Sequence, residues 1–118
     1  MGVAGRYTFP KDFRLRNAAQ FKKVYDGGAK RVSRSFVLFA LRNGLEFSRF
    51  GLTTPRKLGK AHDRNRVKRR IREILRTSVT QIPGGFDFVL NPRRTVQERP
   101  FEELRDELIA LLATEKST

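Results

Sequence analysis

The chain has 118 residues, the size of one ordinary domain, and its 38% hydrophobic content, with ten Phe, is enough to build a core. It carries 26 Lys and Arg residues against 12 Asp and Glu, and this formal net charge of +14 indicates a polyanionic partner. The lack of Cys excludes a disulfide framework, a thiolate nucleophile and a Cys-ligated zinc site.

The first predicted helix covers residues 18–26. Asn17 followed by Gln20 resembles a capping box, and apolar residues recur after it at helical spacing. Gly27-Gly28 then predicts the end of the helix.

Three strands are predicted next. Ala29–Arg34 fits a short edge strand. Phe36–Arg42 and Leu45–Thr53 flank Asn43-Gly44, which is the strongest short-range signal for a β-hairpin. The first hairpin strand is apolar on both faces, so either both faces are covered or one of them is a ligand surface.

A second helix is predicted from about Arg64 to Ser78, with Asp63 as its N-cap. A turn at residues 83–85 then leads into the strand Phe86–Asn91, which Pro92 ends. Pro100 opens a third helix with an apolar stripe of Phe101, Leu104, Leu108, Leu111 and Leu112. This order of elements predicts an α/β (α+β) two-layer sandwich around one small mixed sheet.

Positive charge is concentrated in residues 56–76, which hold 10 basic and 2 acidic side chains. One face of the second helix is apolar and is expected to dock on the sheet: Val67, Ile71, Ile74 and Leu75. The opposite face is basic and polar: Asn65, Arg69, Arg72 and Arg76, flanked by Arg66, Lys68 and Arg70. Glu73 interrupts this face and is expected to pair in part with Arg69 or Arg70.

Such a stack of like charges favours phosphate binding, because the planar Arg guanidinium suits phosphate oxygens. A merely solvated face and a membrane-bound amphipathic helix are the alternatives. The apolar face is small and has no aromatic residue, which argues against the membrane. The longest apolar run, Phe36–Leu41, is too short to span a bilayer, and residues 1–30 lack the apolar core of a signal peptide. We therefore expect a cytoplasmic protein that binds a polyanion and no membrane.

A group of aromatic residues suggests a second surface. Phe21 and Tyr25 are one helical turn apart, and Phe39 lies on the apolar strand. Beside the cations Arg56 and Lys57, these rings could stack unpaired bases in a cleft between the first helix and the sheet. A core position explains Phe21 equally well.

Catalytic signals are sparse. The single His62 excludes a two-histidine ribonuclease arrangement and fits a phosphate contact or a bystander better than a base. The carboxylates are scattered, so no two-metal site is indicated. We expect neither a catalytic residue nor a tightly bound metal in the protein itself.

The segment Arg64–Glu73 (RNRVKRRIRE), preceded by residues 56–61 (RKLGKA), resembles the signature of the bacterial ribonuclease P protein family. Matches to the opening helix and to the strands Phe36–Phe39 and Arg49–Leu52 extend the resemblance over about residues 12–113. Two departures stand at the end of the second hairpin strand: Thr54-Pro55 replaces the usual Val-Ser, and Arg56 replaces a common Lys.

The resemblance implies one domain over residues 1–118, with flexible ends at 1–8 and 114–118, and a left-handed β-α-β crossover. It implies an RNA-binding subunit that assists a catalytic RNA in removing the 5′ leader of precursor tRNA, without an obligate protein partner. The required Mg²⁺ would be held mainly by the RNA. A ribosomal-protein-like structural RNA binder and an independent nuclease are the alternatives. The expected contacts with the catalytic RNA are Lys60, Arg64, Asn65, Arg66, Lys68, Arg69, Arg72 and Arg76. The expected leader cleft is formed by Phe21, Tyr25, Phe39, Arg56 and Lys57.

Overall fold

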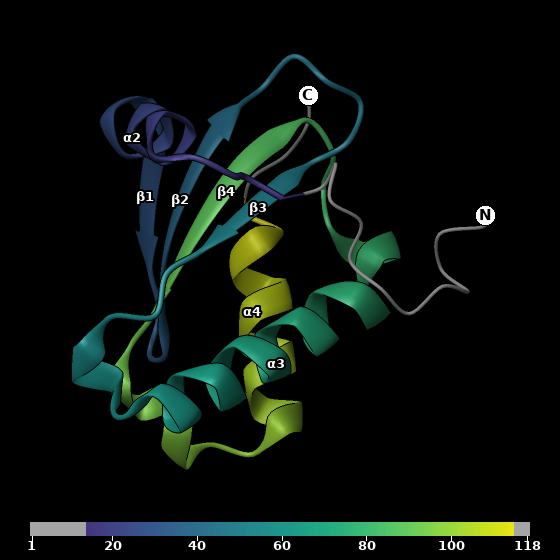
Figure 1. The fold of residues 1–118 in the computed structure, drawn as a ribbon. Helices are drawn as coiled ribbons and strands as arrows, with labels where there is room; N and C mark the ends of the chain where they lie inside the picture. The colour runs from purple at the N-terminus through teal and green to yellow at the C-terminus, as the bar shows by residue number, and fades with distance from the viewer. Residues whose placement is uncertain (1–13, 115–118) are drawn as a thin grey trace.

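The computed structural model describes residues 14–114, which form three α-helices and a four-stranded sheet (Figure 1). The α-helices and strands are α2 (Ala18–Gly27), β1 (Ala29–Val32), β2 (Phe36–Arg42), β3 (Arg49–Leu52), α3 (Ala61–Thr77), β4 (Phe86–Pro92) and α4 (Phe101–Leu112). The 3₁₀ turns are η2 (Arg56–Leu58), η3 (Val79–Gln81) and η4 (Arg94–Glu98). Within this range no helix is long and apolar enough to cross a membrane. Apart from Thr114, the ends predicted to be flexible lie outside the described residues.

Helix α2 begins with the predicted capping box. The Asn17 side chain accepts a hydrogen bond from the Gln20 amide at 3.0 Å, and the Gln20 side chain accepts one from the Asn17 amide at 3.3 Å. The helix ends where the Gly28 amide donates to the Val24 carbonyl at 2.8 Å. Val24 is fully buried, so α2 docks on the sheet by one face.

Helix α3 starts about one turn earlier than predicted. Its N-cap is Lys60, so the assignment of Asp63 as the N-cap is wrong. Asp63 lies inside the first turn, where its carboxylate accepts a hydrogen bond from the Lys60 amide at 3.3 Å. A carboxylate at this position also complements the positive end of the helix dipole.

The sheet order is β1-β2-β4-β3, so the predicted hairpin between β2 and β3 is wrong. Strand β4 lies between them, antiparallel to β2 and parallel to β3. It pairs with β2 over seven residues, whereas β3 contributes only four. The hairpin in the structure is β1–β2, and the handedness of the β3-α3-β4 crossover stays a prediction.

Asn43-Gly44 carries the chain across the end of β4 instead of turning it back. The Asn43 amide donates to the Gly85 carbonyl at 3.0 Å, and its side chain donates to the Phe47 carbonyl at 3.2 Å and to the Asp87 carboxylate at 2.9 Å. Gly44 has a φ of 75°, as a turn residue requires. Asn43-Gly44 therefore does form a turn, but the strand that follows it does not pair with the strand that precedes it.

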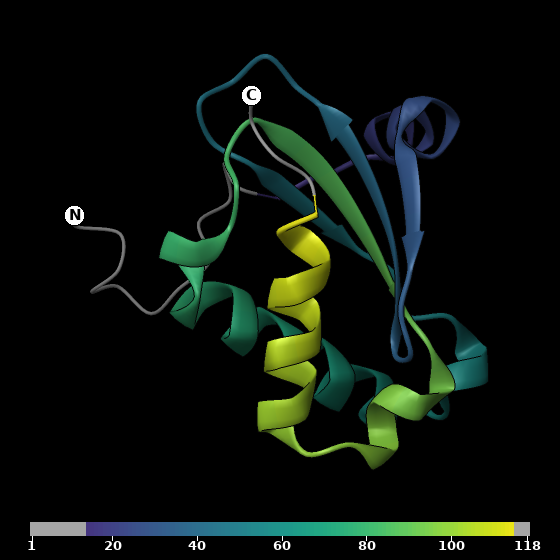
Figure 2. The same cartoon turned by 180° about the vertical axis from the view of Figure 1, so that it is seen from behind.

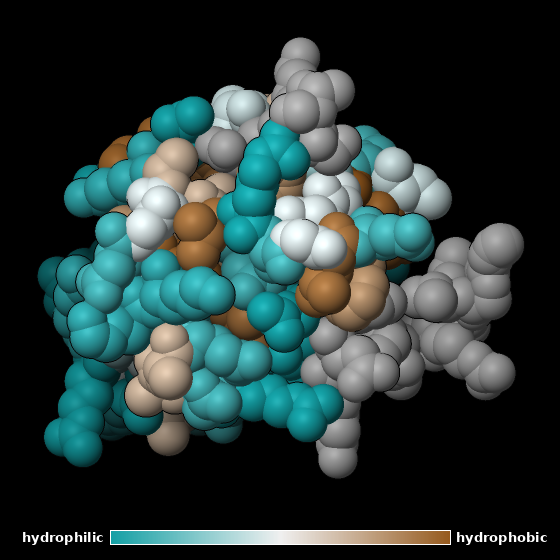
Figure 3. Space-filling view, turned by 90° about the horizontal axis from the view of Figure 1, so that it is seen from above, coloured by the Kyte–Doolittle hydropathy of each residue, from teal (hydrophilic) through white to brown (hydrophobic). Residues whose placement is uncertain are grey.

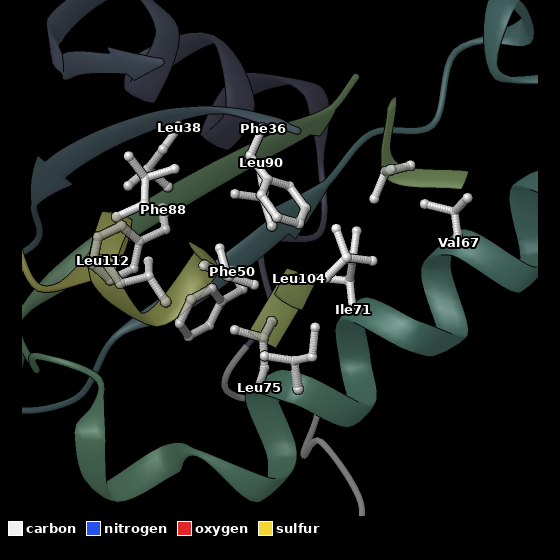
Figure 4. Packing of buried hydrophobic residues seen from close by; sticks show 14 of the residues in the cluster. Phe36, Leu38, Phe50, Val67, Ile71, Leu75, Phe88, Leu90, Leu104 and Leu112 are labelled. Atoms are coloured by element: carbon white, nitrogen blue, oxygen red, sulfur yellow. The ribbon is translucent and has the colours of Figure 1, made fainter. Parts of the chain in front are cut away.

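The main core lies between the sheet and helices α3 and α4, as Figure 4 shows from close by. The predicted apolar residues of both helices are buried there, except that Phe101 is only partly buried. Helix α2 covers part of the opposite sheet face over a smaller cluster containing Val24 and Val89. Figure 2 shows α4 in front of the sheet, with α2 beyond it. The α+β sandwich is thus confirmed, with α2 as a partial outer layer.

The β1–β2 turn is held to α4 through Glu107. This carboxylate accepts hydrogen bonds from the Ser33 hydroxyl and from the Ser35 amide, the latter at 2.6 Å, and it pairs with Arg99. Partial burial works to raise the pKa of Glu107, but these hydrogen bonds and the nearby guanidinium together hold the pKa below its ordinary value. The carboxylate is therefore a structural anchor that depends on being ionised.

Ile71→Ala should lower the free energy of unfolding by about 2–5 kcal/mol, because Ile71 is fully buried against the sheet and its loss leaves a cavity. Arg69→Ala, on the exposed side of the same helix, should change stability by about 0.5 kcal/mol or less. Urea denaturation of both variants measures the difference. Equal losses would show that Arg69 holds the fold.

Glu107→Gln should make stability less dependent on acid pH. The folded-state pKa of Glu107 lies below its ordinary value of 4.5, so its stabilisation is present above that value and is lost as the pH falls through the folded-state pKa. Urea denaturation from roughly pH 6 down to pH 3 should therefore show a steeper loss for the wild type than for the variant. Parallel curves would contradict the anchoring role.

Candidate RNA-binding surfaces

The burial of one face of α3 determines which of its side chains reach solvent. Val67, Ile71, Ile74 and Leu75 are at most 3% exposed. Since a helix has 3.6 residues per turn, this fixes the opposite face toward solvent. The spacing of the apolar residues in the sequence alone predicts this rotation.

Three arginines of α3 are exposed and have no protein partner among residues 14–114: Arg66, Arg69 and Arg72. Asn65 is exposed beside them, and Lys68 is partly exposed. Cations without a carboxylate partner keep their full charge and all of their donors for a ligand. We call Asn65, Arg66, Lys68, Arg69 and Arg72 the α3 surface.

Other basic residues of α3 are engaged within the protein. Arg64 donates to the Gly59 carbonyl at 3.0 Å. Arg76 pairs with Glu73, so the expected pairing of Glu73 with Arg69 or Arg70 is wrong. The hydrogen bond from Arg76 lowers the pKa of Glu73.

Arg70 turns inward, although it stands within the most basic part of the sequence. Its guanidinium donates to the carbonyls of Val96 and Arg99, at 3.2 and 2.5 Å. Burial is the larger of two causes that lower the pKa of Arg70. The neighbouring positive charge of Arg66 is the second cause. These contacts make Arg70 part of the fold and separate it from the α3 surface.

The turn before α3 exposes further cations. Lys60 is exposed, as are Arg56 and Lys57 on η2. Gly59 has a φ of 123°, and a Cβ there would lie 2.8 Å from the Asp63 carboxylate, so this position requires glycine. The sharp turn brings η2 directly against the start of α3.

An open groove of about 530 Å³ lies on the α2 side of the sheet, beyond the part that α2 covers. Val37 and Phe39 form its apolar floor, and Pro55 and Pro92 add further apolar surface to its lining. Its full lining is Lys30, Val37, Phe39, Thr53, Pro55, Lys57, Asn91, Pro92, Arg93 and Arg94. Four cations around an apolar floor suit a strand with a charged backbone and flat bases. Seen from above, the described surface is mainly hydrophilic, with separate apolar patches (Figure 3).

Phe39 is the aromatic centre of this groove. Its ring lies 4.9 Å from that of Tyr25, in an edge-to-face arrangement. The Lys30 ammonium lies 5.9 Å from the Phe39 ring centroid, within the range of a cation–π contact. One side of the ring is thus held by protein, while the ring itself remains only partly buried.

Asn91 is a groove residue that the sequence reasoning missed. Its side-chain oxygen accepts hydrogen bonds from the Thr53 hydroxyl at 2.5 Å and from the Tyr25 hydroxyl at 3.1 Å. Helix α2, strand β4 and the residue after β3 therefore meet at one amide group, whose NH₂ donors have no partner among residues 14–114. Lys30, Thr53, Arg93 and Arg94 were missed too, because placing them in one groove requires the strand order.

Three predicted cleft residues do not line the groove: Phe21, Tyr25 and Arg56. Phe21 packs against the small cluster under α2, where a Cβ on Gly51 would come within 2.6 Å of its ring. Tyr25 contacts two residues of the groove lining, Phe39 and Asn91. Arg56 is exposed on η2.

Pro55, one of the departures from the family pattern, does line the groove. It is the N-cap of η2, where its carbonyl accepts a hydrogen bond from the Leu58 amide at 3.0 Å.

Acidic and histidine side chains give no sign of a metal centre in residues 14–114. No three such groups are arranged there to hold an ion. His62 is exposed, with its ring nitrogen 3.5 Å from the Asp63 carboxylate. The predicted catalytic RNA contacts and the predicted leader cleft therefore remain predictions about binding.

The exposed arginine face and the cationic, aromatic groove of this small α+β domain are features of an RNA-binding protein. The Ribonuclease P family model matches residues 9–116. The chain is 38% identical over 109 residues to the ribonuclease P protein component of Thermotoga maritima, covering 89% of this chain and 93% of that protein. It is 33% identical over 106 residues to that of Streptococcus pneumoniae strain Hungary19A-6, covering 90% and 86%.

Solved structures agree with these relatives. The Thermotoga maritima protein superposes with a TM-score of 0.83 at 36% identity, covering 88% of this chain and 98% of that chain. A Staphylococcus aureus RNase P protein, described as a mutant with defective mRNA degradation activity, gives a TM-score of 0.81 at 27% identity and covers 88% of both chains. The chain belongs to the ribonuclease P protein family. It is an RNA-binding subunit that acts with an RNA partner in tRNA processing, and the ribosomal alternative is not favoured.

Binding to the RNA partner should weaken steeply with salt, because cations of the α3 surface that contact phosphates, as predicted, would displace counterions from them. We expect a slope that corresponds to roughly five to ten released ions in the wild type, and a slope smaller by about one in Arg69→Ala. Filter binding from low to moderate salt measures both slopes. Arg105→Ala on α4 is the matched control and should keep the wild-type slope. A flat salt profile in the wild type would refute phosphate recognition.

Proposed function

We propose that the α3 surface binds the catalytic RNA, while the groove holds the 5′ leader of precursor tRNA. The observation that supports this division best is the groove itself, where a partly exposed aromatic ring lies among four cations. A single strand needs such a combination, since its bases stack on aromatic rings and its phosphates attract cations. A folded RNA helix is bound mainly through its backbone, for which the exposed arginines of α3 are suited.

Four groove residues and the neighbouring Tyr25 have distinct proposed tasks. Lys57 and Arg94 lie on neighbouring elements and contact leader phosphates. Phe39 offers its free side to a base, and Tyr25 supports the ring from the edge. The NH₂ group of Asn91 donates to an acceptor on a base or a phosphate, because Thr53 and Tyr25 already occupy its oxygen. The protein thereby increases the affinity for a substrate that still carries its leader.

Cleavage itself is assigned to the RNA partner. No three His, Asp or Glu side chains within residues 14–114 are arranged to hold an ion. We propose that the required Mg²⁺ is held mainly by RNA. The cytoplasmic location stays a prediction.

Mixing the purified chain with the catalytic RNA at low magnesium should stimulate 5′ maturation of precursor tRNA. The protein neutralises phosphate charge that extra magnesium would otherwise have to screen. Gel analysis of single-turnover cleavage measures the rate, and the chain without the RNA should give no product. Product from the chain alone, or no stimulation by it, would overturn the proposal.

Lys57→Ala tests the proposed role of the groove. In the reconstituted enzyme it should reduce the preference for precursor over mature tRNA, while its affinity for the catalytic RNA stays near that of the wild type. Arg105→Ala, which removes a cation from α4, should change neither quantity. An unaltered preference in Lys57→Ala would remove Lys57 from the leader site.

A further inference from the structure

The connector between β4 and α4, residues 93–99, lies between the groove and helix α3. It supplies Arg93 and Arg94 to the groove. At its other end Arg99 pairs with Glu107, and between them Val96 is 1% exposed. These contacts hold the segment to its neighbours, and the neighbours determine where its arginines lie.

On the groove side, the connector is bonded to the turn that carries Lys57. Arg94 Nε donates to the Lys57 carbonyl at 3.2 Å, and the Gln97 side chain donates to the Leu58 carbonyl. The connector is also bonded to the β1–β2 turn, since the Arg93 amide donates to the Ser35 carbonyl at 2.7 Å. The rim of the groove is thus assembled around this segment.

On the helix side, the connector is held by Arg70. The two donors of its guanidinium reach the carbonyls of Val96 and Arg99, which lie three residues apart. The planar fork of a guanidinium suits this double contact, because it presents two donors side by side. Hydrogen bonds from a charged donor are also stronger than neutral ones, and more so where water is partly excluded. Arg70 is therefore a clamp on the far side of the connector.

We propose that Arg70 is a positioning residue for the leader groove and does not contact the catalytic RNA, an inference that rests on the proposed function. Arg69 and Arg66 face solvent and have no protein partner within residues 14–114. Arg70 instead donates hydrogen bonds to two carbonyls of the connector. Removing the clamp loosens the segment that aims Arg93 and Arg94 into the groove. The leader then loses contacts although no groove side chain has changed.

The test compares two adjacent arginines of α3 with opposite expected effects. Arg70→Ala in the reconstituted enzyme should lower the preference for precursor over mature tRNA by roughly tenfold, the scale of a lost charged hydrogen bond. Its affinity for the catalytic RNA should stay within about twofold of the wild type. Arg69→Ala should instead weaken binding to the catalytic RNA and leave the preference for precursor tRNA near that of the wild type. Both affinities are measured by equilibrium binding, with thermal unfolding of each variant recorded alongside.

Two further variants keep the test decisive if Arg70→Ala folds poorly. Arg70→Lys keeps the charge but has no fork, so it should restore only part of the preference. Gln97→Ala releases the connector from η2, and should reduce the preference in the same way. The effects of Arg70→Lys and Gln97→Ala combined should be less than additive, because both act through one segment.

Three outcomes count against the inference. If Arg70→Ala weakens catalytic-RNA binding as much as Arg69→Ala does, Arg70 is an RNA contact. If Arg70→Ala or Arg70→Lys lowers only the unfolding temperature and leaves the preference intact, its role is structural alone. If the wild-type enzyme binds precursor and mature tRNA equally well, the leader groove is wrong, and the positioning role fails with it. In the first two cases the proposed function stands.

Discussion

The pairing of β4 with β2 over seven residues is the interaction from which the sheet order and the groove follow. It places β4 in the centre of the sheet and leaves β3 on its other side. Asn91 of β4 then lies opposite Val37 and within reach of Thr53, and the end of β4 leads directly into the connector. The groove exists because one buried strand brings together residues from both of its neighbours.

The net charge of +14 must be accommodated by a compact domain. Two half-buried arginines have carboxylate partners: Arg49 pairs with the buried Asp87 at 2.7 Å, and Arg99 pairs with Glu107. The exposed arginines of α3 have none among residues 14–114. Their mutual repulsion is offset by the four apolar residues on the opposite face of the helix, each contributing about 1.5–3 kcal/mol by burial. The stability of the core therefore permits a surface on which like charges stand close together without protein partners among residues 14–114.

Local patterns in the sequence predicted what local physics decides. The capping box at Asn17, the apolar face of α3 and the start of α4 depend on residues a few positions apart. The position of β4 depends instead on a competition between distant strands, so the turn signal at Asn43-Gly44 led to the wrong partner. The groove shares that limit: Phe39 and Lys57 were identified by residue type, but Asn91 and Arg94 become neighbours only through the strand order.

Arg70 shows why a charge pattern alone cannot assign the arginines of a basic helix. Arg69 and Arg70 are adjacent and carry the same charge, yet their positions around the helix differ by about 100°. That rotation turns one guanidinium toward solvent and the other toward two carbonyls of the connector. A guanidinium that already donates to two carbonyls is held in place by them, and its loss would leave both carbonyls without their charged donor. The same residue type therefore binds a ligand at one position and holds the ligand site in shape at the next.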